Sequence, residues 1–405
     1  MRTLYFEANV PKVLISKALR PVWPGVIWSP LSPSRFADLP EPALPGPHWV
    51  RVRNRQCGIC ATDLTLLLVK ADPRVAVAAL PGLSRFYLGH EVVSDVVEVG
   101  SGVTAVRVGD RVIMDTLSVG PTCFSQEISP PCRHCSAGDY PLCENQSAGV
   151  GPAGTGGGWG EGYTAHESEV FPLPNDLTDD QAVLVEPASV ALRAVLRRVP
   201  AAGAPVLVLG CGIIGLLTIG IVRIVAPQAR IAAMARYPHQ AEMARHLGAD
   251  EIISGGEGYA EATRLTGGHL YVGPLDNKML LGGYDVVYDV VGSGRTIRDS
   301  LRWARAGGAV VVVGISPHLV KTDLSPVWHQ QVDLRGSIGH GIEDWRGQRV
   351  HGYDLVIRWI RDGALPTDGL ITHRFPLSQY KRAVATATDK RTGAIKVLLD
   401  MQEPA

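Results

Sequence analysis

The sequence has no surplus of charge of either sign and no long apolar run. Lys and Arg together number 39, as do Asp and Glu, so the formal net charge is zero at pH 7. Without a strong net field we expect no nucleic-acid partner and no membrane partner. The longest apolar candidates, such as LTLLLV at 64–69, are far shorter than the roughly 20 residues that span a bilayer. The start, MRTLYFEANVPKV, lacks the apolar core of a signal peptide, so we expect a cytoplasmic protein.

Cysteine is also scarce, and its placement argues against a disulfide scaffold. The count is seven, an odd number, and four of them lie within 123–143 in a C-x8-C-x2-C-x7-C array. In a chain without an export signal, such a cluster favours metal over disulfides. Four thiolates make a closed tetrahedral zinc site that holds a loop and does no chemistry. Reduced thiols without metal are the alternative. The predicted ligands are Cys123, Cys132, Cys135 and Cys143.

The length and the change of texture along the chain predict two domains. At 405 residues, with 46% hydrophobic and 19% charged residues, the chain is globular and too long for one ordinary core. The first half has short alternating runs at 48–54 and 91–100 among many turn residues, which predicts an antiparallel, partly barrel-like β domain. From about residue 186, short apolar runs alternate with helical patterns, which predicts a doubly wound parallel sheet. The fold class is therefore α/β.

A glycine-rich fingerprint, GCGIIG at 210–215, follows a buried strand and opens an apolar helix. Gly210 would make the tight turn, Gly212 would let the backbone approach a pyrophosphate, and Gly215 would let helix and strand pack closely. Ile213 and Ile214 begin the helix, whose N-terminus favours phosphate. A turn that binds nothing is the alternative.

The end of the second strand predicts which dinucleotide binds. A NAD site usually has an acidic residue about 20 positions after the last glycine, but Ala235 and Arg236 stand here. The missing carboxylate removes repulsion against a 2′-phosphate, and the guanidinium can bind that phosphate. We predict NADP as the preferred coenzyme, with NAD as a second possibility. The alternative is that Arg236 is a solvated surface residue.

A second set of metal-ligand residue types is spread along the first half of the chain. Cys60 in CATD, His90 in GHE and Glu186 in VEPASV supply a thiolate, an imidazole and a carboxylate. Three protein ligands leave one position of a tetrahedral zinc open, which is typical of a catalytic site. Zinc there can polarise an alcohol oxygen beside a nicotinamide. The alternatives are an ordinary histidine and a Glu186 that caps the next helix.

The flanking residues fit the same interpretation. Thr62 could carry away the proton of a substrate hydroxyl, Asp63 could orient the imidazole, and Glu91 could be an outer ligand or a structural acid. Cys57 competes for the role of ligand, and we interpret it as a buried thiol. The predicted catalytic residues are Cys60, Thr62, Asp63 and His90.

These motifs together resemble the medium-chain zinc-dependent alcohol dehydrogenases across essentially the whole chain. The matched pieces are CGICATDL, LGHE, VGDRV, the cysteine lobe, VEPASV, GCGIIG and ITHRFPL. The glutamate of VEPASV is similar to the sorbitol, threonine and glucose dehydrogenase branch. The resemblance implies a GroES-like catalytic domain at 1–185, completed by 341–405, and a Rossmann domain at 186–340. It also implies a homodimer or homotetramer.

Three departures from the family pattern concern the surroundings of the site. The stretch at 71–86 lengthens the spacing between Cys60 and His90, and the stretch at 269–283 has the look of an insertion without an assigned role. Many relatives have a histidine three positions after the relay hydroxyl, where Thr65 stands here. The proton path beyond Thr62 therefore stays open.

The resemblance implies an oxidoreductase with two zinc ions per chain and NADP, acting on an alcohol, polyol or sugar CH–OH group. Two other hypotheses compete with it: a non-catalytic scaffold that keeps the fold and structural zinc, and a zinc-free quinone reductase of the same superfamily. The intact set of Cys60, His90 and Glu186 argues against both. The sequence leaves the substrate itself open.

Overall fold

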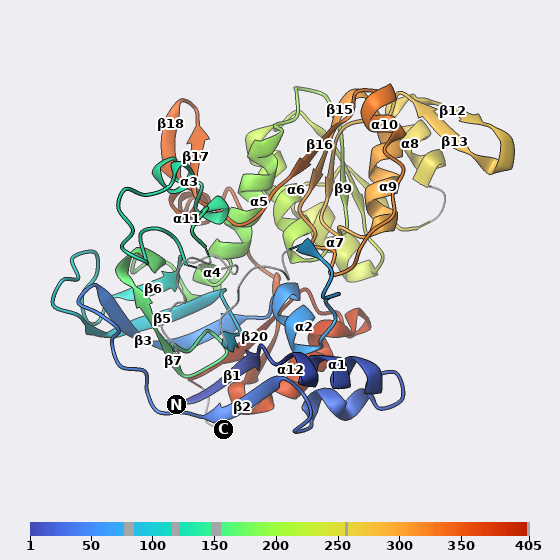
Figure 1. Ribbon diagram of the computed structural model, residues 1–405. Helices are drawn as coiled ribbons and strands as arrows, with labels where there is room; N and C mark the ends of the chain where they lie inside the picture. The colour runs from blue at the N-terminus through green and yellow to red at the C-terminus, as the bar shows by residue number, and fades with distance from the viewer. Residues whose placement is uncertain (77–84, 116–120, 147–154, 256–257, 403–405) are drawn as a thin grey trace. The chain divides into compact units, whose positions relative to one another are not determined.

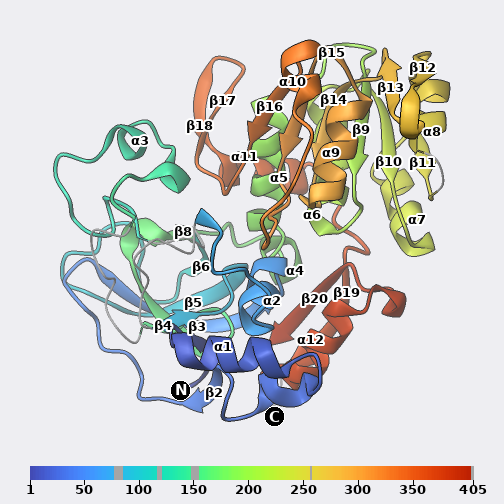
Figure 2. The same ribbon diagram turned by 45° about the vertical axis from the view of Figure 1, so that its right-hand side comes forward.

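The structure is a computed structural model that describes residues 1–76, 85–115, 121–146, 155–255 and 258–402. The chain forms two compact units, one made of Met1–Glu186 with Ile371–Ala405 and the other of Pro187–Leu370. Figure 1 shows the elements of both units, and Figure 2 shows them turned by 45°. None of the helices in the described ranges is long and apolar enough to cross a membrane.

The first unit is built on a seven-stranded sheet. Its order is β19-β20-β3-β5-β6-β8, with β7 also paired to β3, and every pair except β19–β20 is antiparallel. Alternating residues of β3 are buried, among them Val50 and Val52, as expected for a strand with one face on a core. The strands are β3 (Trp49–Gly58), β5 (Val92–Val99), β6 (Arg111–Met114), β7 (Gly162–His166), β8 (Val170–Pro172), β19 (Ile371–Pro376) and β20 (Lys396–Asp400).

A smaller antiparallel sheet and several helices complete this unit. The sheet has the order β2-β1-β4, with β1 (Arg2–Glu7), β2 (Ser34–Asp38) and β4 (Arg85–Tyr87). The helices are α1 (Val10–Leu19), α2 (Ala61–Leu67), α3 (Arg133–Ser136), α4 (Asp179–Ala182) and α12 (Tyr380–Thr388). Most of the expected insertion at 71–86 lies outside the described residues.

The second unit contains a six-stranded parallel sheet with the order β11-β10-β9-β14-β15-β16. In chain order this is 3-2-1-4-5-6, the arrangement of a dinucleotide-binding doubly wound fold. Both the strand order and the antiparallel first unit confirm the predicted fold class. The strands are β9 (Pro205–Leu209), β10 (Arg230–Met234), β11 (Glu251–Ile253), β14 (Tyr284–Asp289), β15 (Ala304–Val312) and β16 (Asp333–Gly336).

The helices of this unit connect and cover the sheet. Helix α6 contacts β9, and α9 contacts β14 and β15. The helices are α6 (Ile213–Val225), α7 (Pro238–His246), α8 (Gly258–Thr266), α9 (Gly294–Trp303), α10 (Ser325–His329) and α11 (Gly352–Arg361), and α5 (Val185–Arg197) spans the boundary between the units.

The stretch at 269–283 forms a β-hairpin of β12 (His269–Val272) and β13 (Lys278–Leu281). Its Leu280 is 1% exposed and belongs to the same apolar cluster as Trp303. This stretch therefore adds to the core of the second unit, a contribution that its composition did not reveal.

The segment 341–370 lies in the second unit, whereas the sequence placed it in the first. It contains a second hairpin, β17 (Ile342–Trp345) with β18 (Gln348–His351), followed by α11. The reason is its packing: Arg193 forms an ion pair with Glu343 at 2.9 Å, and Leu365 lies against Gly220 of α6. The chain returns to the first unit at Ile371, with β19.

Candidate active site

Three metal-ligand side chains of the first unit come together at the ends of α2 and β5. Ligand atoms of Cys60, His90 and Glu91 all lie within 4.8 Å of one another. Cys60 is the N-cap of α2, and Glu91 directly precedes β5. Residues 30 positions apart in the sequence thus meet near the starts of α2 and β5.

Asp63 contacts the backbone around these ligands and lies beside the His90 ring. Its carboxylate accepts hydrogen bonds from the backbone N–H of Cys60 at 3.2 Å and of Gly89 at 2.9 Å, and it lies 3.6 Å from Nδ1 of His90. Burial lowers the pKa of His90, but the charges of Asp63 and Cys60 outweigh it, and the pKa is raised well above its usual value. Asp63 therefore fixes both the cap and the orientation of the imidazole, as carboxylates do behind metal-bound histidines.

Glu186, the predicted third ligand, lies in the first turn of α5 and is not in the group whose ligand atoms lie within 4.8 Å of one another. It is buried, with 9% of its surface exposed, and it interacts electrostatically with His90 and Glu91. Burial raises the pKa of its carboxyl to about 7, although the charge of His90 opposes the shift. A cation beside this carboxyl would stabilise its charged form, because the cation would offset the free-energy cost of burying the charge.

A buried cation that the sequence analysis missed balances Glu91. Lys396 of β20 forms an ion pair with Glu91, and each side chain is only 1% exposed. Lys396 also donates to the carbonyl of Ile59 at 3.4 Å. Gly58 is required here, because a Cβ at that position would lie 1.9 Å from Oε2 of Glu91. The one available signal was a lysine in an otherwise apolar tail, AIKVLLD.

The hydroxyl of Thr62 has no hydrogen-bond partner among the described residues, although its oxygen is buried. By contrast, the Thr65 hydroxyl bonds the carbonyl of Ala61 at 2.9 Å, as helical threonines commonly do. Cys57 is completely buried, and burial together with the nearby carboxylates raises the pKa of its thiol well above the usual value. Other buried hydroxyls also lack a partner, but Thr62 is two residues from the ligand Cys60, so a ligand bound at this site could satisfy it.

The four cysteines of the lobe also converge. Sulfur atoms of Cys123, Cys132, Cys135 and Cys143 lie within 4.8 Å of one another, and none is in a disulfide.

Backbone and amide donors face these sulfurs. Cys123 Sγ accepts from the N–H of Cys132 at 3.3 Å and from Nδ2 of Asn145 at 3.2 Å, and Cys132 Sγ accepts from the N–H of Cys135 at 3.5 Å. Burial raises the pKa of Cys132, but the backbone N–H groups of Cys135 and Glu144 and the thiols of Cys135 and Cys123 outweigh it and lower the pKa to about 6. N–H···S bonds favour thiolates, so this donor set fits a tetrahedral metal.

The glycines of the fingerprint have distinct environments in the second unit. Gly210 has φ +105°, in the left-handed region, directly after β9. A Cβ on Gly215 would lie 1.8 Å from the carbonyl oxygen of Gly210, whereas a Cβ on Gly212 would meet nothing within 4 Å. Ile213 and Ile214 form the first turn of α6. Gly212 thus faces open space at a helix N-terminus, where a phosphate could approach.

The end of β10 presents one buried and one exposed residue. Ala235 is 1% exposed, and its N–H donates to the carbonyl of Ile253 at 3.0 Å. Arg236 is exposed. The guanidinium is therefore on the surface after the second strand, and no carboxylate stands in the preceding position.

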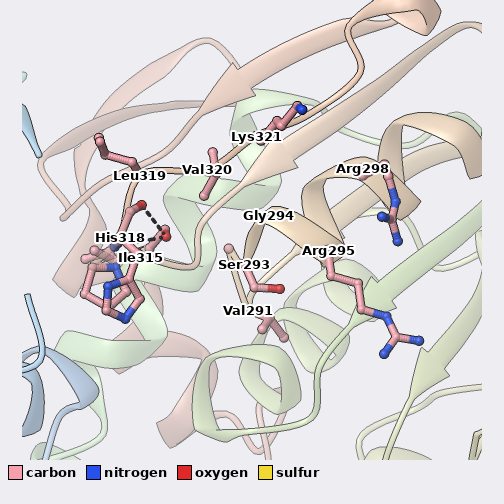
Figure 3. A pocket seen from close by; sticks show the side chains of 13 residues that line it. Val291, Ser293, Gly294, Arg295, Arg298, Ile315, His318, Leu319, Val320 and Lys321 are labelled. Carbon is pink, nitrogen blue, oxygen red and sulfur yellow. Dashed lines mark hydrogen bonds between the residues drawn. The ribbon is translucent and has the colours of Figure 1, made fainter. Parts of the chain in front are cut away.

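A hollow of about 450 Å³ lies at the carboxyl ends of β14 and β15, between the start of α9 and the loop 315–321. Figure 3 shows Val291 and Ser293 at its centre and Ile315 and His318 at one side. Val291 also borders the fingerprint, because a Cβ on Gly210 would lie 2.6 Å from it. Ligands of doubly wound folds bind at this edge of the sheet.

Comparison with known proteins identifies the class. The sequence matches a family described as "Alcohol dehydrogenase GroES-like domain" over residues 46–175 and one described as "Zinc-binding dehydrogenase" over residues 214–350. The chain belongs to the zinc-type medium-chain dehydrogenase family and is an oxidoreductase. This confirms the resemblance inferred from the motifs.

Particular relatives are polyol and sugar-acid dehydrogenases. D-arabinitol dehydrogenase 1 of Uromyces fabae is 27% identical over 338 residues, which are 83% of this chain and 85% of the relative. L-idonate 5-dehydrogenase of Vitis vinifera is 29% identical over 357 residues, which are 88% and 89% of the two chains. The structure of a zinc-binding dehydrogenase from Sinorhizobium meliloti 1021, solved with NADP bound, superposes with a TM-score of 0.68 at 27% sequence identity. The superposition covers 91% of this chain and 95% of that chain.

Proposed function

We propose that the protein transfers hydride between NADP and a CH–OH group of an alcohol, polyol or sugar, with one catalytic and one structural zinc ion. The observation that carries this proposal is the convergence of Cys60, His90 and Glu91 within 4.8 Å, beside the buried Glu186. Among the described residues of this unit, a thiol, an imidazole and a carboxyl meet, and the buried carboxyl of Glu186 interacts electrostatically with His90, which suits alcohol oxidation at a metal better than a scaffold.

Cys60, His90 and Glu186 would hold the catalytic zinc, with Glu91 as an outer or alternate ligand. When bound, zinc supplies a Lewis acid for the substrate oxygen, and the nicotinamide accepts the hydride. Asp63 keeps the imidazole in place through its bonds at the start of α2. The ion pair with Lys396 balances the charge of Glu91, so the carboxylate of Glu91 is already neutralised before a metal binds.

Thr62 would accept the proton of the substrate hydroxyl. Its buried oxygen lacks a partner, so a substrate hydroxyl would provide the missing hydrogen bond. Thr65 is an unsuitable second relay because its hydroxyl bonds the backbone of its own helix. From Thr62 the proton would have to leave to water by another route.

Cys123, Cys132, Cys135 and Cys143 would hold the structural zinc. The N–H donors around the sulfurs support the deprotonated form that a metal requires. This zinc stabilises the lobe and takes no part in the reaction.

Arg236 would bind the 2′-phosphate of NADP. Ala235 offers no carboxylate to the ribose of NAD, and Arg236 is exposed at the end of β10. A hydrogen bond to a charged group contributes about 1.5–3 kcal/mol, which is ten- to a hundredfold in preference. The NADP bound to the relative from Sinorhizobium meliloti supports the same choice.

We infer the substrate class from the relatives, which act on an arabinitol and an idonate as their names state. Both contain neighbouring hydroxyls on a short carbon chain, so a polyol or sugar derivative is the first class to test. We also propose a homodimer or homotetramer. The parallel sheet ends at β16, which pairs with β15 alone among the described strands and exposes Leu334. Sedimentation velocity measures the oligomeric state directly.

The catalytic proposal is tested by replacing Cys60 with Ala. We expect turnover of a polyol panel to fall below detection while NADP binding, measured by fluorescence titration, changes less than about twofold. The matched control is Cys57→Ala, which removes a neighbouring buried thiol and should retain turnover. Full activity of the Cys60→Ala protein would exclude the proposed ligand.

The coenzyme proposal is tested separately with Ala235→Asp, Arg236→Leu. This double change adds repulsion and removes the cation, so kcat/KM should shift from NADP toward NAD. A wild-type protein that prefers NAD would show that Arg236 points to solvent and does not bind phosphate.

A further inference from the structure

Helix α1 (Val10–Leu19) of the first unit has an exposed face made of apolar side chains, while its Leu19 packs against the core. Figures 1 and 2 show it in dark blue along the outside of this unit. Its buried residue is Ser16, whose hydroxyl donates to the carbonyl of Leu31 at 3.4 Å. Lys12 and Lys17 lie at the half-buried flanks of the helix. An ordinary surface helix buries its apolar stripe and exposes polar residues, whereas the exposed residues of α1 are apolar.

Every exposed residue of α1 is apolar, and the exposed apolar surface continues into the following turn. Val10, Pro11, Leu14, Ile15 and Ala18 recur at spacings of three and four and so share one face. Val10 is 66% exposed and Leu14 54%. The outward surface, which we call the α1 face, consists of Val10, Pro11, Leu14, Ile15, Ala18, Pro21, Val22, Trp23 and Pro24.

Contacts at both ends of α1 hold the helix in this orientation. Asn9 caps it by accepting from the N–H of Lys12 at 3.1 Å, and Arg20 donates to the carbonyl of Leu68 at 2.8 Å. Trp28, in the turn that follows, packs on Tyr380 of α12 at 5.9 Å between ring centroids. The apolar face is therefore held outward by the fold and is presented as a rigid surface.

The charges around the α1 face are basic. Residues 8–37 contain Lys12, Lys17, Arg20 and Arg35 and no Asp or Glu. Lys381 of α12 lies 5.7 Å from the Trp28 ring and adds a further cation. Lys12 is paired with Glu7 and Arg74 with Asp72, so Lys17, Arg20, Arg35 and Lys381 supply the excess of positive charge. The net charge of zero for the whole chain conceals this local asymmetry, which is why composition predicted no membrane partner.

We propose that the α1 face binds reversibly to an anionic membrane surface. Helices that lie in the interface bury apolar side chains among the acyl chains while basic residues meet the anionic headgroups. Trp23, 46% exposed, is a side chain that prefers this boundary. An acidic protein groove would match the charges as well, but an exposed Trp together with apolar and basic side chains favours the lipid interface.

The test is co-sedimentation of the whole protein with vesicles of phosphatidylcholine alone and of phosphatidylcholine mixed with phosphatidylserine. We expect binding to the mixed vesicles, at least about tenfold weaker binding to the neutral ones, and loss of binding in high salt. Leu14→Glu with Val22→Glu should reduce binding at least about tenfold, because it places charge where apolar contact is required. The control is Leu275→Glu, which changes a fully exposed leucine at the tip of the β12–β13 hairpin and should bind like wild type.

Dehydrogenase activity and melting temperature should be the same in all three proteins, which shows that each is folded. Equal binding by the Leu14→Glu, Val22→Glu protein, or no binding of wild type to the anionic vesicles, would overturn the proposal. A wild-type oligomer that this double change dissociates would overturn it too, because a second copy of the chain would then cover the α1 face.

Discussion

Replacing Lys396 with Met is expected to destabilise the first unit strongly. Lys396 and Glu91 are each 1% exposed, and Met has nearly the length of Lys, so the substitution removes a charge without opening a large space. Glu91 would then keep a buried charge without the cation that it pairs with. Breaking a buried ion pair by removing one partner costs about 3–5 kcal/mol, mostly from the unpaired charge.

A double-mutant cycle isolates this interaction. Lys396→Met and Glu91→Gln should each lower the free energy of unfolding, measured by urea titration at neutral pH. The protein with both changes contains neither charge, so it should lose at least about 2 kcal/mol less than the sum of the single losses. Lys381→Met is the control: Lys381 is exposed, and its loss should change stability by less than about 0.5 kcal/mol.

The outcome that would refute the reasoning is additivity. If Lys396→Met costs less than about 1 kcal/mol, or if the double change costs the sum of the two, the pair contributes no coupling. Lys396 would then have no part in holding Glu91 beside the metal ligands.

The other predictions use matched substitutions near the two sites. Gly215→Ala should cost about 3 kcal/mol of stability because its methyl group would overlap the Gly210 carbonyl. Gly212→Ala should fold normally yet weaken NADP binding at least about tenfold in a calorimetric titration. Equal stability of the two variants would contradict the packing argument. Thr62→Val should lower kcat about a hundredfold and Thr62→Ser should retain most of it, and a fully active valine variant would remove Thr62 from the proton path. Asp63→Asn should raise the zinc dissociation constant about 10- to 100-fold in a chelator competition assay, and an unchanged value would leave Asp63 with a structural role only.

The sequence predicts the sheet of the second unit well because its strands are short apolar runs with glycine at their ends. APVLVLG corresponds to β9, and ARIAAMA contains β10. Burial on both faces imposes this pattern locally, so it is visible without tertiary information. The sequence placed 341–370 in the first unit, but it lies in the second. Its placement depends on the packing of α11 and on the Arg193–Glu343 pair, which join distant parts of the chain.

The candidate site could be predicted where its residues lie in short motifs. Cys60 and Asp63 share one helical turn, and His90 and Glu91 are adjacent, so their spacing alone suggests joint action. Lys396 could not be found this way, because 305 positions separate it from Glu91. The outward face of α1 was likewise invisible: an apolar periodicity predicts a helix, but which way the stripe points depends on the cap and on the contacts of Arg20 and Trp28.

Zinc content per chain is the measurement that tests the central claim most directly. Elemental analysis of metal-loaded, desalted protein should give two zinc ions for wild type and one for Cys60→Ser, which loses turnover but keeps the stability conferred by the cysteine lobe. Cys135→Ser should also give one and should lower the melting temperature before it affects the chemical step. Two zinc ions in the Cys60→Ser protein, or none in active wild type, would contradict the proposed catalytic zinc.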